Sequence, residues 1–150
     1  MRSAHGIASL PVLAIAAVLG VAVGVSGYTF VYAKGDSYLT DDPAACVNCH
    51  VMRGQYDGWR NGPHHAAATC NDCHTPAGKV AKYLVKASNG WHHSKAFTTG
   101  EYPDAIQMRA SSRAVVEANC KTCHADLTAA MTGGGEVSCI RCHESVGHLR

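Results

Sequence analysis

The chain has 150 residues and a formal net charge of +2 at pH 7. It has room for one domain plus an anchor, and its small charge does not indicate nucleic acid or any strongly charged partner. Aromatic residues make up only 7% of the sequence, so a chain this short would struggle to build a hydrophobic core of its own.

The N-terminal segment carries no formal charge from Gly6 to Ala33, a run of 28 residues. Read as a helix rising about 1.5 Å per residue, it extends about 42 Å, more than the roughly 30 Å of a bilayer hydrocarbon core. We therefore predict a membrane anchor helix in residues 1–34. Arg2 favours an N-terminus inside the cell, which places a domain at residues 35–150 outside.

A cleaved signal peptide is the competing interpretation of this segment. Val31-Tyr32-Ala33 resembles a small-residue cleavage site. The apolar run is about twice as long as the usual 7–15 residues of a signal sequence. The length therefore favours an uncleaved, single-pass anchor.

Every Cys falls in one of four C-x-x-C pairs, and a His follows each pair at once. The four motifs are Cys46-Val47-Asn48-Cys49-His50, Cys70-Asn71-Asp72-Cys73-His74, Cys120-Lys121-Thr122-Cys123-His124 and Cys139-Ile140-Arg141-Cys142-His143. Disulfides and zinc sites do not account for this spacing. C-x-x-C-H is the c-type haem attachment motif, so the sequence predicts four covalently bound haem c groups.

Four haem macrocycles supply the apolar surface that the side chains lack. We therefore predict a mostly α fold with irregular segments and little or no sheet, made of one N-terminal transmembrane helix and a compact tetrahaem c-type cytochrome domain. Covalent haem attachment takes place outside the bacterial cytoplasmic membrane, in agreement with the predicted orientation of the anchor.

Turn and cap residues divide the domain. They predict a helix start at Asp42-Pro43, a helix over 78–88 closed by Asn89-Gly90, a helix over 110–119, and a flexible turn at 133–135.

The iron ligands follow only in part from the motifs. His74, His124 and His143 are the expected proximal ligands of haems 2, 3 and 4. In the first motif, Met52 follows closely enough to compete with His50 for the same face of the iron. The His residues outside the motifs are His5, His64, His65, His92, His93 and His148.

Few of those six are secure distal ligands. His5 lies on the wrong side of the membrane, and His148 more plausibly serves a neighbouring haem than its own. One of the pair His64-His65 can cap another haem. We therefore expect some irons to be open or completed by another protein.

Four stretches resemble the NapC/NirT family of quinol dehydrogenases, in its compact tetrahaem form that serves cytochrome c nitrite reductase. They run from Asp42 to Met52, from Cys70 to His74, from Lys82 to Trp91 and from Glu117 to His124. The order of the motifs, Met52 and the short length carry the resemblance.

The resemblance implies roles for individual residues. Met52 would ligate haem 1, with His50 displaced. His65 would be the distal ligand of haem 3 and His148 that of haem 2. Haem 4, on His143, would face the catalytic partner. That partner could supply the sixth ligand of the haem 4 iron.

The resemblance also implies a quinol site beside haem 1, with Lys82 and Lys86 nearby. The family usually has Asp where this chain has Asn89, and Asn can hydrogen-bond but cannot take a proton. Either the role of the family's carboxylate is therefore positional, or Lys82, Lys86 or a water chain carries the proton, with His92 and His93 as further candidates.

The implied function is oxidation of menaquinol by an enzyme in the bacterial inner membrane, with its haem domain in the periplasm. The electrons would pass to a multihaem reductase, in the first place the pentahaem nitrite reductase. The alternatives are another periplasmic reductase as client, a passive electron-transfer cytochrome without a quinol site, and a reductase acting directly on a small oxyanion.

Overall fold

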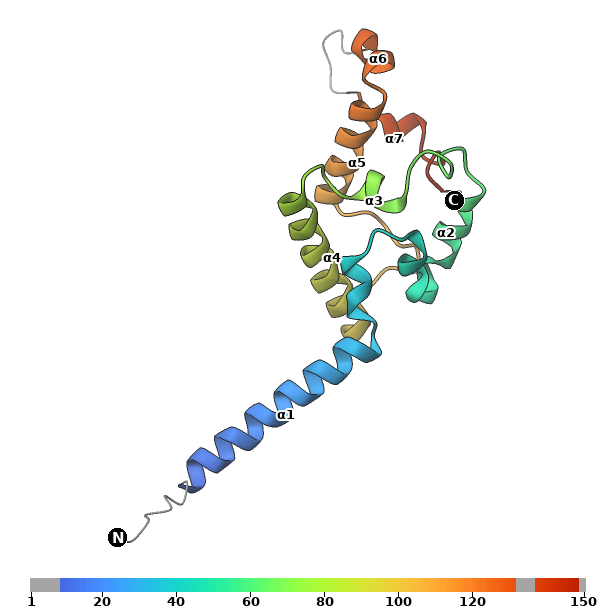
Figure 1. Ribbon diagram of the computed structural model, residues 1–150. Helices are drawn as coiled ribbons and strands as arrows, with labels where there is room; N and C mark the ends of the chain where they lie inside the picture. The colour runs from blue at the N-terminus through green and yellow to red at the C-terminus, as the bar shows by residue number, and fades with distance from the viewer. Residues whose placement is uncertain (1–8, 132–136, 149–150) are drawn as a thin grey trace, which may run out of the picture. The chain divides into compact units, whose positions relative to one another are not determined.

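The computed structural model describes residues 9–131 and 137–148, and these contain helices and no strand (Figure 1). The prediction of a mostly α fold is confirmed. Arg2, His5 and the predicted turn at 133–135 lie outside the described residues. The chain divides into two compact units, residues 1–36 and 37–150.

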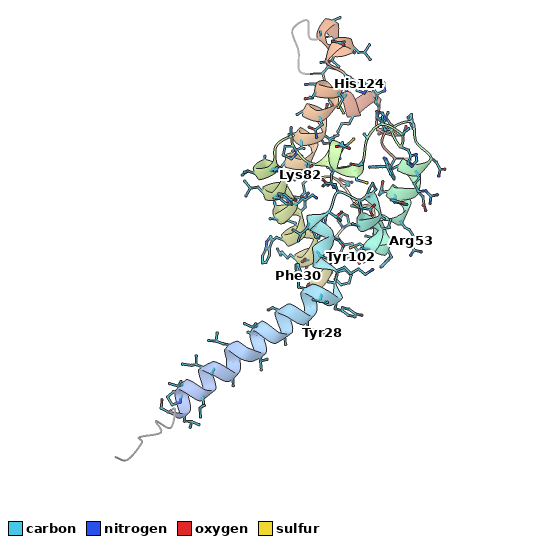
Figure 2. The ribbon with its side chains drawn as sticks, in the orientation of Figure 1. Tyr28, Phe30, Arg53, Lys82, Tyr102 and His124 are labelled. Atoms are coloured by element: carbon cyan, nitrogen blue, oxygen red, sulfur yellow. The ribbon has the colours of Figure 1, made fainter. Side chains whose placement is uncertain are left out.

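The first unit contains one long apolar helix, α1 (Leu10–Tyr32), with a mean hydropathy of 2.2. By length and composition it is long enough to cross a membrane. Its large apolar side chains are exposed all around the helix. Tyr28 and Tyr32 stack near its C-terminal end, with ring centroids 5.9 Å apart, and Figure 2 shows Tyr28 and Phe30 in these last turns. Aromatic residues at such a position are typical of a membrane interface.

The other elements are short except for two helices. In chain order they are η1 (Gly35–Leu39), η2 (Pro43–Asn48), η3 (His50–Met52), α2 (Arg53–Arg60), α3 (Cys70–His74), α4 (Lys79–Thr99), α5 (Ala110–Cys123), α6 (Ala125–Thr128), η4 (Ala129–Met131) and α7 (Cys139–Cys142). Irregular segments at 61–69 and 100–109 join α2 to α3 and α4 to α5, as expected of a chain that wraps around bound groups.

The predicted end of the helix at Ser88 is wrong. Helix α4 continues through Asn89-Gly90 and ends at Gly100, which has a left-handed φ of 70°. The reason is tertiary, because the ring of Tyr38 lies against Gly90, where an added Cβ would be 3.6 Å from it. This contact offsets the roughly 1 kcal/mol by which Gly disfavours a helix.

The helix predicted over 110–119 is also longer than expected. Helix α5 continues to Cys123 and so includes both Cys residues of the third motif. Its backbone hydrogen bonding extends one residue further, because the N–H of His124 donates to the carbonyl of Cys120. The third motif is therefore the last turn of a helix.

The polypeptide contributes little core of its own. Among the described residues, Val116 is the one hydrophobic side chain classed as buried, at 8% exposure, and Thr75 and Lys86 are the buried polar ones. Polar contacts help to hold the helices: the amide of Asn119 on α5 donates to the carbonyls of Cys73 (3.0 Å) and Thr75 (2.8 Å). A chain of this kind is suited to folding around large apolar cofactors.

Candidate haem centres

Three of the four motifs share one local structure. The second occupies α3, the third ends α5 and the fourth forms α7. In the last two, the N–H of the motif His donates to the carbonyl of the first motif Cys, at 2.9 Å for His124 and 3.0 Å for His143. A helical turn places the two Cys residues on neighbouring positions of one face, and the His follows directly.

The first motif has a different backbone. Cys46 lies in η2, which Asp42 caps by accepting the N–H of Ala44 at 2.9 Å, as Asp42-Pro43 predicts. Cys49 is extended, with φ −90° and ψ 115°, and a separate turn, η3, then begins at His50. In that turn His50 is exposed and Met52 is half-buried.

His74 and His148 face each other across a separation that suits a shared metal. Their ring centroids are 6.3 Å apart and their planes differ by 7°. Two imidazoles that bind one metal at about 2 Å each have centroids about 6 Å apart. Burial, and secondarily His148, lowers the pKa of His74, which favours the neutral imidazole that binds metals. These two residues therefore fit a haem iron between them.

His64 and His124 form a second pair of the same kind, with ring centroids 6.1 Å apart and planes at 80°. His64 Nδ1 also lies 3.2 Å from the carbonyl oxygen of Val146. Figure 2 shows His124 at the C-terminal end of α5. The second pair fits an iron at the third motif.

The structure does not bring His65 to His124. The ring of His65 instead packs edge-on against Trp59, at 4.8 Å between centroids. The indole N–H of Trp59 in turn donates to the carbonyl of Ala68 at 2.8 Å. His64 replaces His65 as the candidate ligand, and His65 helps to hold this loop.

Motifs that follow one another along the chain also lie next to one another in the structure. The thiols of Cys46 and Cys70, from the first and second motifs, lie close enough for each to shift the pKa of the other. Helix α3 contacts α5, and α5 contacts α7. The attachment positions therefore form a continuous series from the first motif to the fourth.

Glu117 on α5 fixes the start of the fourth motif, a role that no sequence motif indicates. Its carboxylate accepts hydrogen bonds from the Ser138 hydroxyl and from the backbone N–H groups of Cys139 (2.8 Å) and Ile140 (3.4 Å). Burial alone would raise the pKa of Glu117, but these hydrogen bonds outweigh it and the net shift is downward. Glu117 thus acts as an N-cap for α7 from another helix.

Lys82 and Lys86 lie one turn apart on α4, and both bind Asp41, a residue that sequence analysis did not single out (Figure 2 labels Lys82). Lys86 Nζ is 2.8 Å from Asp41 Oδ1 and 2.6 Å from the carbonyl of Thr40, and its side chain is only 7% exposed. The amide of Asn71, inside the second motif, donates to the same carboxylate at 3.0 Å. Asp41 therefore joins the lysines to the haem motifs.

Asn89 is half-buried on the same helix, three residues after Lys86. The next turn carries His93, whose Nδ1 lies 2.9 Å from the hydroxyl oxygen of Tyr38. His92 and His93 are thus both on α4, and His93 is the one that meets η1.

The match to a family of known proteins covers almost the whole chain. Residues 7–150 match the model of the NapC/NirT cytochrome c family, N-terminal region. The chain belongs to this family. The predicted resemblance is confirmed, and membership of a cytochrome c family establishes covalently bound haem c as the cofactor class.

Several characterised members of the NapC/NirT family are similar over most of their length. The cytochrome c-type protein NrfH of Wolinella succinogenes is 39% identical over 145 residues, which are 87% of this chain and 82% of that one. The cytochrome c nitrite reductase subunit NrfH of Nitratidesulfovibrio vulgaris is 34% identical over 99% of this chain and 90% of its own.

A solved structure has the same fold. It is the crystal structure of a cytochrome c nitrite reductase NrfHA complex bound to the inhibitor HQNO, with a TM-score of 0.65 and 31% identity. The likeness covers 93% of this chain and 90% of the matched chain.

Proposed function

We propose that this chain is a membrane-anchored tetrahaem quinol dehydrogenase that oxidises menaquinol and donates electrons to a pentahaem cytochrome c nitrite reductase. The observation that carries the proposal is the similarity to two NrfH proteins over 82% and 90% of their lengths. The matched crystal structure, an NrfHA complex, supports a reductase subunit as the partner.

Four haem c groups, one on each motif, account for all eight Cys residues. Once attached, haem c accepts and releases one electron at a time, with a potential set by its axial ligands. The proposed ligands are Met52 for haem 1, His74 and His148 for haem 2, His124 and His64 for haem 3, and His143 for haem 4. The sixth position of haem 4 would be completed by the reductase.

The proposed quinol site lies beside the first motif. Asp41 holds both lysine side chains, so Lys82 and Lys86 present positive charge and N–H donors at a fixed place. Lys86 is buried and Lys82 is more exposed, at 7% and 24% of their side chains, which makes Lys82 the lysine that a quinol reaches. Asn89 can orient a quinol oxygen through its amide without taking a proton.

The proposed location is the bacterial cytoplasmic membrane. Residues 1–34 anchor the chain with the N-terminus inside, and residues 35–150 form the haem domain in the periplasm. An apolar α1 of 23 residues supports the anchor, and Arg2 supports the orientation. A membrane-soluble quinol can then reach the domain from the bilayer.

Another periplasmic reductase is a weaker choice of client. The cytochrome c-type protein TorY of Escherichia coli O157:H7 is 27% identical, and the matched segment is only 43% of its length. The NrfH proteins match along most of theirs. Agreement in overall length therefore favours nitrite reductase.

A two-step assay of the detergent-extracted holoprotein tests the proposal. We expect a reduced menaquinol analogue to reduce the haems, followed in the visible spectrum. Addition of a cytochrome c nitrite reductase and nitrite should then reoxidise them. Haems that stay oxidised with the menaquinol analogue but are reduced by dithionite would identify a passive electron carrier instead.

A further inference from the structure

A tyrosine and a histidine from distant parts of the chain form a hydrogen-bonded pair. The hydroxyl oxygen of Tyr38, in η1, lies 2.9 Å from Nδ1 of His93, on α4. Their ring centroids are 6.3 Å apart and the planes are tilted by 48°. The Tyr38 ring also packs against Gly90, at van der Waals distance from where a Cβ would lie.

The pair lies next to the first haem motif. Burial, and then the neighbouring thiols of Cys49 and Cys46, raises the pKa of Tyr38 to about 12. The same thiols become uncharged thioethers when haem is attached, so burial is then the cause that keeps the pKa of Tyr38 raised. Tyr38 therefore keeps its proton at neutral pH and can donate it to His93.

His93 is also on the face of α4 that carries the proposed quinol residues. It follows Asn89 by four residues and Lys86 by seven, so all three lie along one side of a continuous helix. The continuation of α4 beyond Ser88 is what places His93 there.

The other polar groups at this site are poor proton acceptors. Lys82 and Lys86 donate hydrogen bonds to Asp41, and a lysine side chain in such a pair has donors but no acceptor. The carboxylate of Asp41 is held by both lysines, which lower its pKa below the ordinary range. Asn89 has no group that titrates.

His93 is suited to accept a proton. Burial, and then the neighbouring His92 and Arg109, lowers the pKa of His93. The imidazole is therefore neutral at pH 7, although its ring still reaches solvent. When the Tyr38 hydroxyl donates to Nδ1, the imidazole's own hydrogen is on Nε2. If Nδ1 then takes up a proton, Nε2 can release its hydrogen as a proton.

We infer that Tyr38 and His93 form the proton-accepting arm of the quinol site at the first haem. The inference rests on the proposed function and deepens it. As the O–H bond of a quinol hydroxyl breaks, its proton goes to Oη of Tyr38, and the proton of Tyr38 goes to Nδ1 of His93. His93 releases a proton from Nε2 to solvent. The haem held at the first motif would accept the electron that the quinol loses in the same step, and a second step of the same kind, after the imidazole has regained its Nε2 hydrogen from solvent, would complete the oxidation to quinone.

Three variants of the full-length holoprotein test this inference. They are Tyr38→Phe, His93→Gln and, as a matched control at an exposed position two residues further along α4, Lys95→Gln. Haem content and the visible spectrum first establish that each variant is assembled. Binding of HQNO, followed by quenching of its fluorescence, then reports on the site without turnover, and oxidation of a menaquinol analogue reports on the proton transfer.

We expect His93→Gln and Tyr38→Phe to slow quinol oxidation by at least about tenfold and to weaken HQNO binding by about fivefold. Lys95→Gln should stay within about twofold of the wild type in both. Wild-type values of either quantity in both Tyr38→Phe and His93→Gln would overturn the inference while leaving the proposed function intact. A wild-type protein that neither binds HQNO nor oxidises the menaquinol analogue would overturn the proposed function itself.

Discussion

The first haem motif and the third have the same C-x-x-C-H pattern but different structures. The third is the last turn of α5, where the N–H of His124 donates to the carbonyl of Cys120 at 2.9 Å, and a second imidazole faces it at 6.1 Å. The first is divided at the extended Cys49, and its His50 is exposed while Met52 is half-buried.

This difference shows that the motif determines covalent attachment but not ligation. Attachment needs only two Cys residues at suitable spacing. The axial ligands depend on the backbone around the motif, because the helical form directs its His toward a partner imidazole. The divided form at the first motif places His50 and Met52 together in the turn after Cys49, so two ligands can compete. Haem 1, with proposed axial ligands that differ from those of haems 2 and 3, is suited to be the haem at which electrons enter.

The largest expected effect concerns the imidazole pair at the third motif. His64→Ala removes the ring that faces His124, so about a quarter of the haem signal should change from low-spin to high-spin in the EPR spectrum. His65→Ala removes only an edge contact with Trp59 and should cost about 0.5–1.5 kcal/mol without a spin change.

EPR and thermal unfolding of the two variants side by side give a direct comparison. A spin change in His65→Ala and none in His64→Ala would restore His65 as the ligand. Only the pair of His74 and His148 would then support the conclusion that the helical motifs direct their His toward a second imidazole.

Sequence analysis reached the cofactor class, the family and the helical fold because each depends on local patterns. The C-x-x-C-H motifs and the apolar run before Lys34 are visible without any tertiary information. The end of α4 was missed because Asn89-Gly90 is a typical helix stop, and only the packing of Tyr38 against Gly90 overrides it.

The details of the site depend on tertiary contacts in the same way. Adjacent His residues give no local signal for which ring reaches a haem, so His65 was expected where the structure places His64. Asp41 and Glu117 look like ordinary solvated acids in the sequence. Their partners lie 41 and 21 residues away, at Lys82 and Ser138, and only the folded chain brings them together.

A smaller effect should separate the two possible ligands of the first motif. Met ligation raises a haem potential relative to bis-His ligation. Met52→His should therefore lower the potential of one haem by on the order of 0.1 V, whereas His50→Ala should leave the potentials nearly unchanged.

Redox titration followed by EPR measures both variants. The opposite result, with His50→Ala changing one potential and Met52→His changing none, would make His50 the ligand. The first motif would then resemble the other three in chemistry despite its different backbone.

The smallest effect concerns the acid that joins the lysines to the first two motifs. Lys82 and Lys86 hold the pKa of Asp41 below its ordinary value of about 3.9. A depressed pKa stabilises the folded state fully above the unfolded pKa, and this contribution is lost as the pH falls through the folded pKa. Asp41→Asn should therefore lower the Tm at pH 5–7, and the difference from the wild type should shrink as the pH falls below the unfolded pKa of about 3.9.

Thermal unfolding between pH 3 and pH 7 checks this dependence, with Asp104→Asn on an exposed segment as the control. Added salt should reduce the difference only in part, because Asp41 is exposed while the Lys86 side chain that it binds is only 7% exposed. A difference that stays constant from pH 7 to pH 3 would mean that the Asn side chain disturbs packing rather than removing a charge. In that case Lys86 would depend on the carbonyl of Thr40 more than on Asp41.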